Sequence, residues 1–134
     1  MAGTLTDVFT ALVGALEDDS TIAAAVGTAI YAAHRPPDTE DAPLPAIYVG
    51  LVSDTRSERG MTWLRIQIDT YVADGDLTAA WAISDAIAGV LHSSGLSISG
   101  WTCYHITRDA HRNNGADADG VLSLSDDYTL ALAR

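Results

Sequence analysis

The sequence contains no lysine, and all seven of its basic residues are arginine. Because eighteen residues are acidic, the formal net charge at pH 7 is −11, with histidine counted as neutral. Such a charge repels the phosphates of nucleic acid unless the few arginines gather on one patch. The lack of lysine and the excess of acid therefore argue against a protein that wraps DNA or RNA.

Cysteine, proline and long apolar runs are also scarce. The one cysteine, Cys103, has no partner for an internal disulfide, so we expect a reducing compartment. The longest apolar run, residues 22–33, is too short to span a bilayer, and the first residues lack the features of a signal peptide. We therefore expect no membrane contact. All four prolines fall within residues 34–45, which predicts a loop or an extended arm there.

Hydrophobic residues make up 48% of the 134 residues, enough for one domain with a single core, spanning residues 1–134. Residues 4–19 have apolar positions three and four apart, and Thr4 with Asp7 resembles a capping box, so a helix is expected there. A short helix capped by Ser20 and ending near Gly27 follows. The stripe of the first helix consists of Leu5, Val8, Phe9, Leu12, Val13 and Leu16.

A third helix is expected within residues 74–95, because aspartates stand at its positive end and Gly95 lies just past its last turn. Its expected inner positions are Leu77, Ala80, Trp81, Ser84, Ile87, Ala88 and Leu91. A brief extended piece is expected around Ile30 and Tyr31. Strands are predicted at residues 46–54, 62–72, 101–112 and 120–133, the last two joined by a hairpin turn.

This order predicts an α+β fold. We expect a mostly antiparallel four-stranded sheet with two main helices packed on one face, plus a short helix and a proline-bearing arm. In the last strand Leu122, Leu124, Tyr128, Leu130 and Leu132 share a side, which Asp126 interrupts. In residues 62–72 one side is apolar, with Leu64, Ile66, Ile68 and Val72.

The other side of the strand at residues 62–72 carries Trp63, Arg65, Asp69 and Tyr71. Both long helices are needed to cover the apolar side, so this second side must meet solvent or another chain. Exposed aromatic residues beside arginine are common anchors of protein–protein contacts. We favour a self-association surface, and the alternative is that Trp63 folds over an edge of its own sheet.

Four potential metal ligands share one parity in a predicted strand: Cys103, His105, Asp109 and His111. Residues 103 and 111 would lie about 27 Å apart at roughly 3.4 Å per residue, so the four cannot form one site. A two-ligand fragment completed by other residues remains open, as does a small metal- or ligand-binding α+β domain. A polar, partly exposed strand face is the preferred interpretation, and we expect no metal or cofactor.

Other catalytic and ion-binding patterns are incomplete. Asp117, Asp119, Gly120 and Asp126 partly imitate a calcium loop, but glycine replaces its first ligand, so an acidic hairpin turn is favoured. Paired acids such as Asp126 with Asp127 are common in solvated turns. The chain has no nucleophile elbow and no glycine-rich phosphate loop after a strand. We therefore expect that the protein is not an enzyme.

The run from residue 63 to residue 100, "WLRIQIDTYVADGDLTAAWAISDAIAGVLHSSGLSISG", resembles the tail-completion, or tail-to-head joining, proteins of long-tailed bacteriophages. The shared pattern is an alternating strand, a short acidic turn, an alanine-rich helix and a glycine stop. The leading helices, the proline-bearing arm, the strand that opens with Pro45, Ile47 and Tyr48, and the closing hairpin at residues 103–132 fit the same family. The resemblance rests on pattern without a catalytic motif, and this chain departs from the family in lacking lysine.

The resemblance implies a ring, generally hexameric, at the head-proximal end of the tail in the virion, similar in architecture to tail terminators. Its expected partners are further copies of itself, the tail tube protein, the head–tail connector or stopper protein, and passing double-stranded DNA bound without sequence specificity. Another neck or tube component of the virion is the alternative. Arg56 and Arg59 are candidates for pairing between subunits. Candidates for an acidic, DNA-repelling channel or rim are Asp38, Glu40, Asp41, Asp117 and Asp119.

Overall fold

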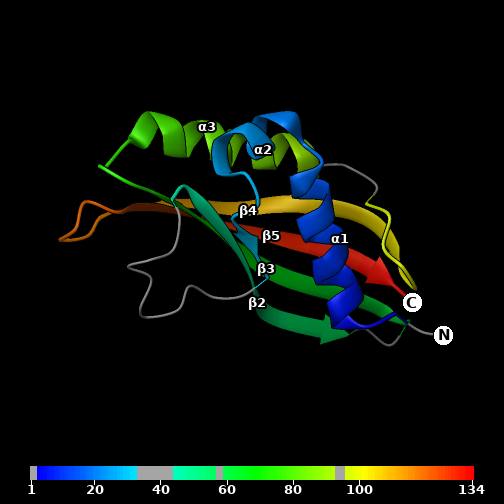
Figure 1. Ribbon diagram of the computed structural model, residues 1–134. Coiled ribbons are helices and arrows are strands. Elements are labelled where there is room, and N and C mark those ends of the chain that lie inside the picture. The colour runs from blue at the N-terminus through cyan, green and yellow to red at the C-terminus, as the bar shows by residue number, and fades with distance from the viewer. Residues whose placement is uncertain (1–2, 33–43, 57–58, 93–95) are drawn as a thin grey trace.

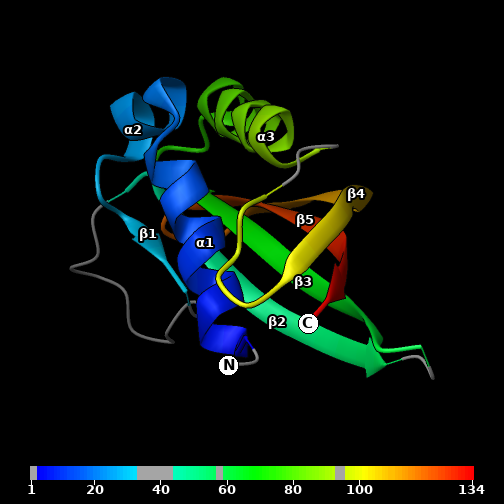
Figure 2. The same cartoon turned by 90° about the vertical axis from the view of Figure 1, so that its right-hand side faces the viewer.

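The computed structural model describes residues 3–32, 44–56, 59–92 and 96–134. Three helices lie together on one face of a twisted sheet (Figures 1 and 2). The helices are α1 (Leu5–Glu17), α2 (Ser20–Val26) and α3 (Leu77–Leu91). The strands are β1 (Ile30–Tyr31), β2 (Ala46–Arg56), β3 (Met61–Val72), β4 (Thr102–Ala116) and β5 (Leu122–Ala133).

The sheet has five strands in the order β1-β2-β3-β5-β4, so the expected α+β class is confirmed but the four-stranded sheet is not. The fifth strand is the short piece expected around Ile30 and Tyr31, which pairs in parallel with Ile47 and Tyr48 of β2. The remaining neighbours are antiparallel. A two-residue strand carries too little alternation for its pairing to be seen in sequence, so the sheet is mixed where an antiparallel one was expected.

The helix starts follow from local side-chain chemistry. The backbone amide of Asp7 donates to the Thr4 hydroxyl at 3.2 Å, and the Thr4 amide donates to the Asp7 carboxylate at 2.9 Å, which confirms the capping box. Helix α2 is capped by Asp19, whose carboxylate accepts from the Ile22 amide at 3.0 Å, and Ser20 is its first residue instead of its cap. Asp76 caps α3 in the same way.

The core lies between the helices and one face of the sheet. We call this face the inner face; it carries Leu64, Ile66 and Ile68 of β3, which are fully buried. On the helix side the buried positions are Val8, Leu12 and Leu16 of α1, Ile22 and Val26 of α2, and Ala80, Ile83, Ser84, Ile87 and Leu91 of α3. Two expected inner positions of α3, Leu77 and Trp81, are exposed instead. Both lie in the first half of the helix, and the Trp81 ring lies against His111 of β4 at 4.4 Å while 40% of the residue stays exposed.

Register shifts interrupt β4 at three places, between Cys103 and His105, Arg108 and Ala110, and Asn113 and Gly115. Each shift inserts one residue relative to β5, so the faces of the strand exchange after it. By contrast, β3 pairs with β5 without interruption from Met61 to Val72. The alternation of odd and even positions therefore predicts correctly which side chains of β3 lie on each face of the sheet. It fails for β4. In the described part of the chain, no helix is long and apolar enough to cross a membrane.

Candidate functional site

The outer face of the sheet, defined by Trp63, Arg65, Gln67, Asp69 and Tyr71 of β3, points away from the helices. Among the described residues no helix lies on this side, as the two cartoon views show (Figures 1 and 2). Trp63 is 39% exposed, and the Arg65 side chain is 50% exposed. This end of the outer face is therefore available for contact with another molecule.

Asp69 is only 8% exposed, although it belongs to the same outer face. The Ser125 hydroxyl donates to its carboxylate at 2.6 Å, and the Gln67 amide donates to it at 2.9 Å. The Asn114 amide donates in turn to the Ser125 oxygen at 2.7 Å. The expectation that Asp69 lies on an open surface is thus wrong, because Gln67 of the same strand and Ser125 of β5 donate the hydrogen bonds that its carboxylate needs.

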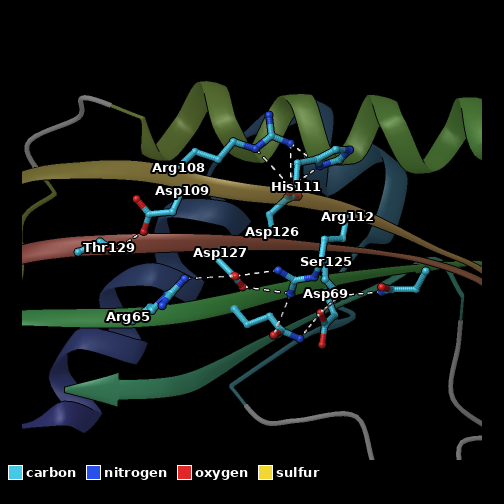
Figure 3. A network of polar contacts seen from close by, with 12 residues as sticks. Arg65, Asp69, Arg108, Asp109, His111, Arg112, Ser125, Asp126, Asp127 and Thr129 are labelled. Carbon is cyan, nitrogen blue, oxygen red and sulfur yellow. Dashed lines mark hydrogen bonds and ion pairs between the residues drawn. The ribbon is translucent and has the colours of Figure 1, made fainter.

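A network of ion pairs and hydrogen bonds lies across the middle of the outer face (Figure 3). Arg112 donates from Nη1 to Asp127 Oδ2 at 2.8 Å, and Arg65 Nη2 approaches the same carboxylate oxygen at 3.8 Å. Arg112 also donates from Nη2 to the side-chain amide oxygen Oε1 of Gln67 at 3.3 Å. The hydrogen bond with Asp127 is the main cause that raises the pKa of Arg112. Asp127 is consequently the anchor that positions two arginines on this face.

Three tyrosines occupy the opposite end of the outer face. The ring of Tyr48 lies 5.0 Å from that of Tyr31 and 5.5 Å from that of Tyr71, with the second pair edge to face. Such pairs stabilise beyond the area that they bury. Tyr71 is half-buried and its ring contacts its own sheet, so the outward aromatic that protrudes most on β3 is Trp63.

A second cluster lies on the inner face, under α3. Asp126 is fully buried, and its carboxylate accepts hydrogen bonds from Arg108 at 2.8 Å and from the Ser84 hydroxyl at 2.7 Å. His111 Nδ1 contacts the same carboxylate, and the ring of Trp81 covers that of His111 at 4.4 Å. Asp126, which interrupts the apolar stripe of β5, therefore joins β4 through Arg108 and His111 (Figure 3) and joins α3 through Ser84.

The charges of this inner cluster are closely coupled. Burial of the guanidinium lowers the pKa of Arg108, but the hydrogen bond and the negative charge of Asp126 outweigh it, so the net shift is upward. Burial also raises the pKa of Tyr128, and the nearby Asp126 carboxylate adds to this rise. Both shifts keep these groups in their ordinary charge states at neutral pH. The cluster thus links α3 to the sheet through hydrogen bonds and opposite charges.

The four candidate metal ligands of β4 do not share a face. The register shifts place Cys103 opposite Leu132 and His111 opposite Asp126, on the inner side, whereas His105 is opposite Ala131, on the outer side. Asp109 lies at the second shift, and its carboxylate accepts a hydrogen bond from the Thr129 hydroxyl. Within the described ranges no three potential ligands come together as a metal site.

The β4–β5 turn contains Asp117 and Asp119, both exposed. Asp117 Oδ1 accepts from the amides of Asp119 at 2.9 Å and Val121 at 3.0 Å, so this carboxylate holds the turn together. The hairpin projects beyond the helices (Figure 1), and the favoured hairpin turn is confirmed, since Asp126 belongs to the strand that follows. Of the five channel candidates, Asp38, Glu40 and Asp41 lie outside the described residues.

The two remaining interface candidates flank the β2–β3 connection. Arg56 is the last residue of β2, two residues beyond the strand end predicted at residue 54, and its backbone pairs with Thr62. Arg59 is exposed in the turn that follows. Both therefore stand at the same end of the sheet as Trp63, which pairs with Thr55.

A groove of about 620 Å³ runs along α1 on the helix side of the molecule. Leu5, Phe9 and Val13 form its apolar floor, and they are the half-buried members of the stripe expected for this helix. Its other lining residues are Thr6, Thr10, Gly14, Glu17 and Ala32. The stripe thus divides, with one part in the core and the other lining the groove.

The sequence places Asp126 and Asp127 in the predicted last strand but does not identify them as anchors, because paired acids are common in solvated turns. The signal was present, because two adjacent acids in the middle of an apolar strand point to opposite faces and each requires a partner. Their partners Arg108 and Arg112 were not identifiable, since the register shifts of β4 change which residues face β5.

The sequence pattern of the family described as "Tail completion protein gp17" matches residues 10–122 of this chain. No curated protein matches the sequence. Among solved structures, the fold is similar to that of a chain in the "Virion of native gene transfer agent (GTA) particle", with a TM-score of 0.75 and 19% sequence identity. The match covers 95% of each chain, so the whole two-layer arrangement is shared.

Proposed function

This chain belongs to the tail completion protein gp17 family and is a structural protein of a phage tail, and we propose that it forms a closed ring at the head-proximal end of the tail. The ring ends the growth of the tail tube and joins the tail to the connector of the head. The neighbour of similar fold comes from a phage-like virion particle, which supports a role in particle assembly.

The observation that carries this proposal is the outer face of the sheet, where Trp63 and Arg65 are exposed beside a buried polar network. A large exposed aromatic residue next to arginine is typical of an interface anchor. A ring of identical subunits requires a contact between two different patches, and closure prevents the growth of open fibres. Each contact of a stable ring is expected to bury more than about 1,000 Å².

The proposal is tested by mixing the purified protein with tail tubes and imaging the mixture by negative stain. A single ring at one end of each tube, together with loss of further tube growth, is the expected result. Trp63→Ala is expected to abolish ring attachment, whereas Tyr104→Ala, which removes the most exposed aromatic side chain of β4, serves as the matched control and retains it. Long stacks formed by the protein alone would identify a tube component instead, and unoccupied tube ends would refute the proposal.

The acidity of the chain fits a ring through which DNA passes. Double-stranded DNA carries about one charge per 1.7 Å, so an acidic bore repels it and lets it slide. We assign Asp119 at the projecting β4–β5 turn to this bore or its rim, because it is exposed and its neighbour Asp117 is engaged in holding the turn.

Asp119→Lys is therefore expected to raise the retention of DNA by the assembled ring, by roughly twofold to tenfold at low salt. The measurement is the fraction of DNA held by rings on a filter as ionic strength rises. Asp85→Lys, the same charge change on the exposed side of α3, is the control. Equal retention by the two variants would remove Asp119 from the bore.

A further inference from the structure

The groove along α1 has no partner within the described part of the chain, although its floor is apolar. We infer that it receives the Trp63-bearing end of the outer face of a second copy of this chain, so that one copy's helix α1 covers the next copy's sheet. This inference rests on the ring proposed above and names the two surfaces that meet in it.

The division of the α1 stripe is the first argument for this contact. Val8, Leu12 and Leu16 are fully buried, which is sufficient to hold the helix on the sheet. Phe9 and Val13 remain half-buried and line the groove. A helix that needs only one face for its own core has a second apolar side for another molecule.

Charge supplies the second argument, because the two surfaces are complementary. Helix α1 contains Asp7 and Glu17 but no basic residue, and Glu17 lines the groove. The Trp63 end of the outer face carries the half-exposed Arg65, with Arg59 in the adjoining turn. In a chain with a net charge of −11, a basic patch beside an exposed indole and an apolar groove edged by acid are suited to each other.

Placement supplies the third argument. The groove lies on the helix side, next to Ala32 at the β1 edge, whereas Trp63 lies on the opposite side of the sheet. Two different patches on opposite sides of one subunit produce a head-to-tail contact, which a rotation between copies closes into a ring. Each copy of the chain carries both the groove and the Trp63 end of the outer face. A second copy therefore fits the groove better than a different tail protein does.

The exposed Thr10 of the groove gives a sharp test, since Thr10→Arg fills the groove without removing a core side chain. The matched control is Thr78→Arg, the same change on the exposed side of α3. Rings assembled on tail tubes are counted by negative stain over a range of protein concentrations, and folding is checked by thermal unfolding. Thr10→Arg is expected to require about 30-fold more protein for half-occupancy of the tube ends, with the control unchanged.

Chemical cross-linking tests the pairing directly. Met61 lies on the outer side of β3 next to Trp63, so a cysteine at this position leaves the Trp63 side chain in place. A Cys103→Ser, Thr10→Cys, Met61→Cys variant treated with a short bis-maleimide on tail tubes is expected to give a ladder of covalent oligomers. The control carries Thr78→Cys in place of Thr10→Cys and is expected to give none. If the wild type forms rings, Thr10→Arg forms them equally well and no ladder appears, this contact is overturned. The proposed ring is then unaffected. Absence of wild-type rings would overturn the proposed function and the contact together.

Discussion

Two adjacent aspartates of β5 show the same ion pair in two environments. Asp126 faces α3 and binds Arg108 at 2.8 Å, and Asp127 faces outward and binds Arg112 at 2.8 Å. Both carboxylates are largely buried, with side-chain exposures of 0% for Asp126 and 10% for Asp127. Their arginines differ more, because Arg108 is 25% exposed under α3, whereas Arg112 is 45% exposed and no helix of the described residues lies above it. The comparison indicates that coverage by a helix, more than the ion pair itself, decides how much each carboxylate contributes to the stability of the subunit.

Under α3 the carboxylate has to be fully satisfied, because a buried charge without partners is very costly. Arg108, Ser84 and His111 all contact Asp126 for this reason. On the outer face Asp127 shares its arginines with water, and screening reduces the strength of the pair. The inner pair therefore contributes to the stability of the subunit, and the outer pair mainly positions groups on a surface.

The largest expected effect compares the two carboxylates directly. Asp126→Asn leaves Arg108 as a partly buried cation without its counter-charge, and we expect the free energy of unfolding to fall by about 3 kcal/mol. Asp127→Asn is expected to lower it by about 1 kcal/mol, because water solvates Arg112. Urea denaturation followed by circular dichroism measures both. Equal losses would contradict the role assigned to helix coverage.

A smaller effect is expected from the serine beside each carboxylate. Ser84→Ala removes a hydroxyl that donates to Asp126 and accepts from Arg108 at 3.0 Å, at a cost of about 2 kcal/mol. Ser125→Ala removes the donor to Asp69 on the outer face, at a cost of about 1 kcal/mol. Thermal unfolding of the two variants provides the comparison, and a greater loss from Ser125→Ala would reverse the ranking of the two faces.

The smallest effect is expected from changing the shape of the cations. Arg108 directs Nε and Nη2 to one oxygen of Asp126 and Nη2 also to Ser84, which a lysine ammonium cannot reproduce from one position. Arg108→Lys is therefore expected to cost about 1 kcal/mol, and Arg112→Lys only a few tenths. Denaturation at low and at high salt separates them, since only the outer pair should respond to salt.

The sequence predicts the helices and the two faces of β3 well because both depend on regular periodicity. Trp63 and Arg65 are found on the outward side, as alternation requires, since β3 pairs with β5 without a register shift. Alternation fails for His105, because one inserted residue at Tyr104 moves it to the face opposite Cys103. No residue type signals such an insertion in this strand.

The sequence also failed to predict which side chains of the outer face are buried. Asp69 was expected to be open because no helix remained to cover it, but Gln67 and Ser125 from the sheet itself supply its hydrogen bonds. A period-two pattern shows on which side a group lies and does not show which neighbours in the sheet bind it. The parallel pairing of β1 was inaccessible for a similar reason, since it depends on the path of the chain and not on its two residues.

The interrupted ladder of β4 has a consequence for how copies meet. This strand is at the edge of the sheet, and its shifts recur every five residues, at Cys103, Arg108 and Asn113. An edge twisted in this way offers no long, flat run of backbone groups onto which another strand could add. Copies crowded together before assembly are thereby kept from joining edge to edge as amyloid-like ribbons. At this edge, association is left to side chains, which can be selective for the correct neighbour.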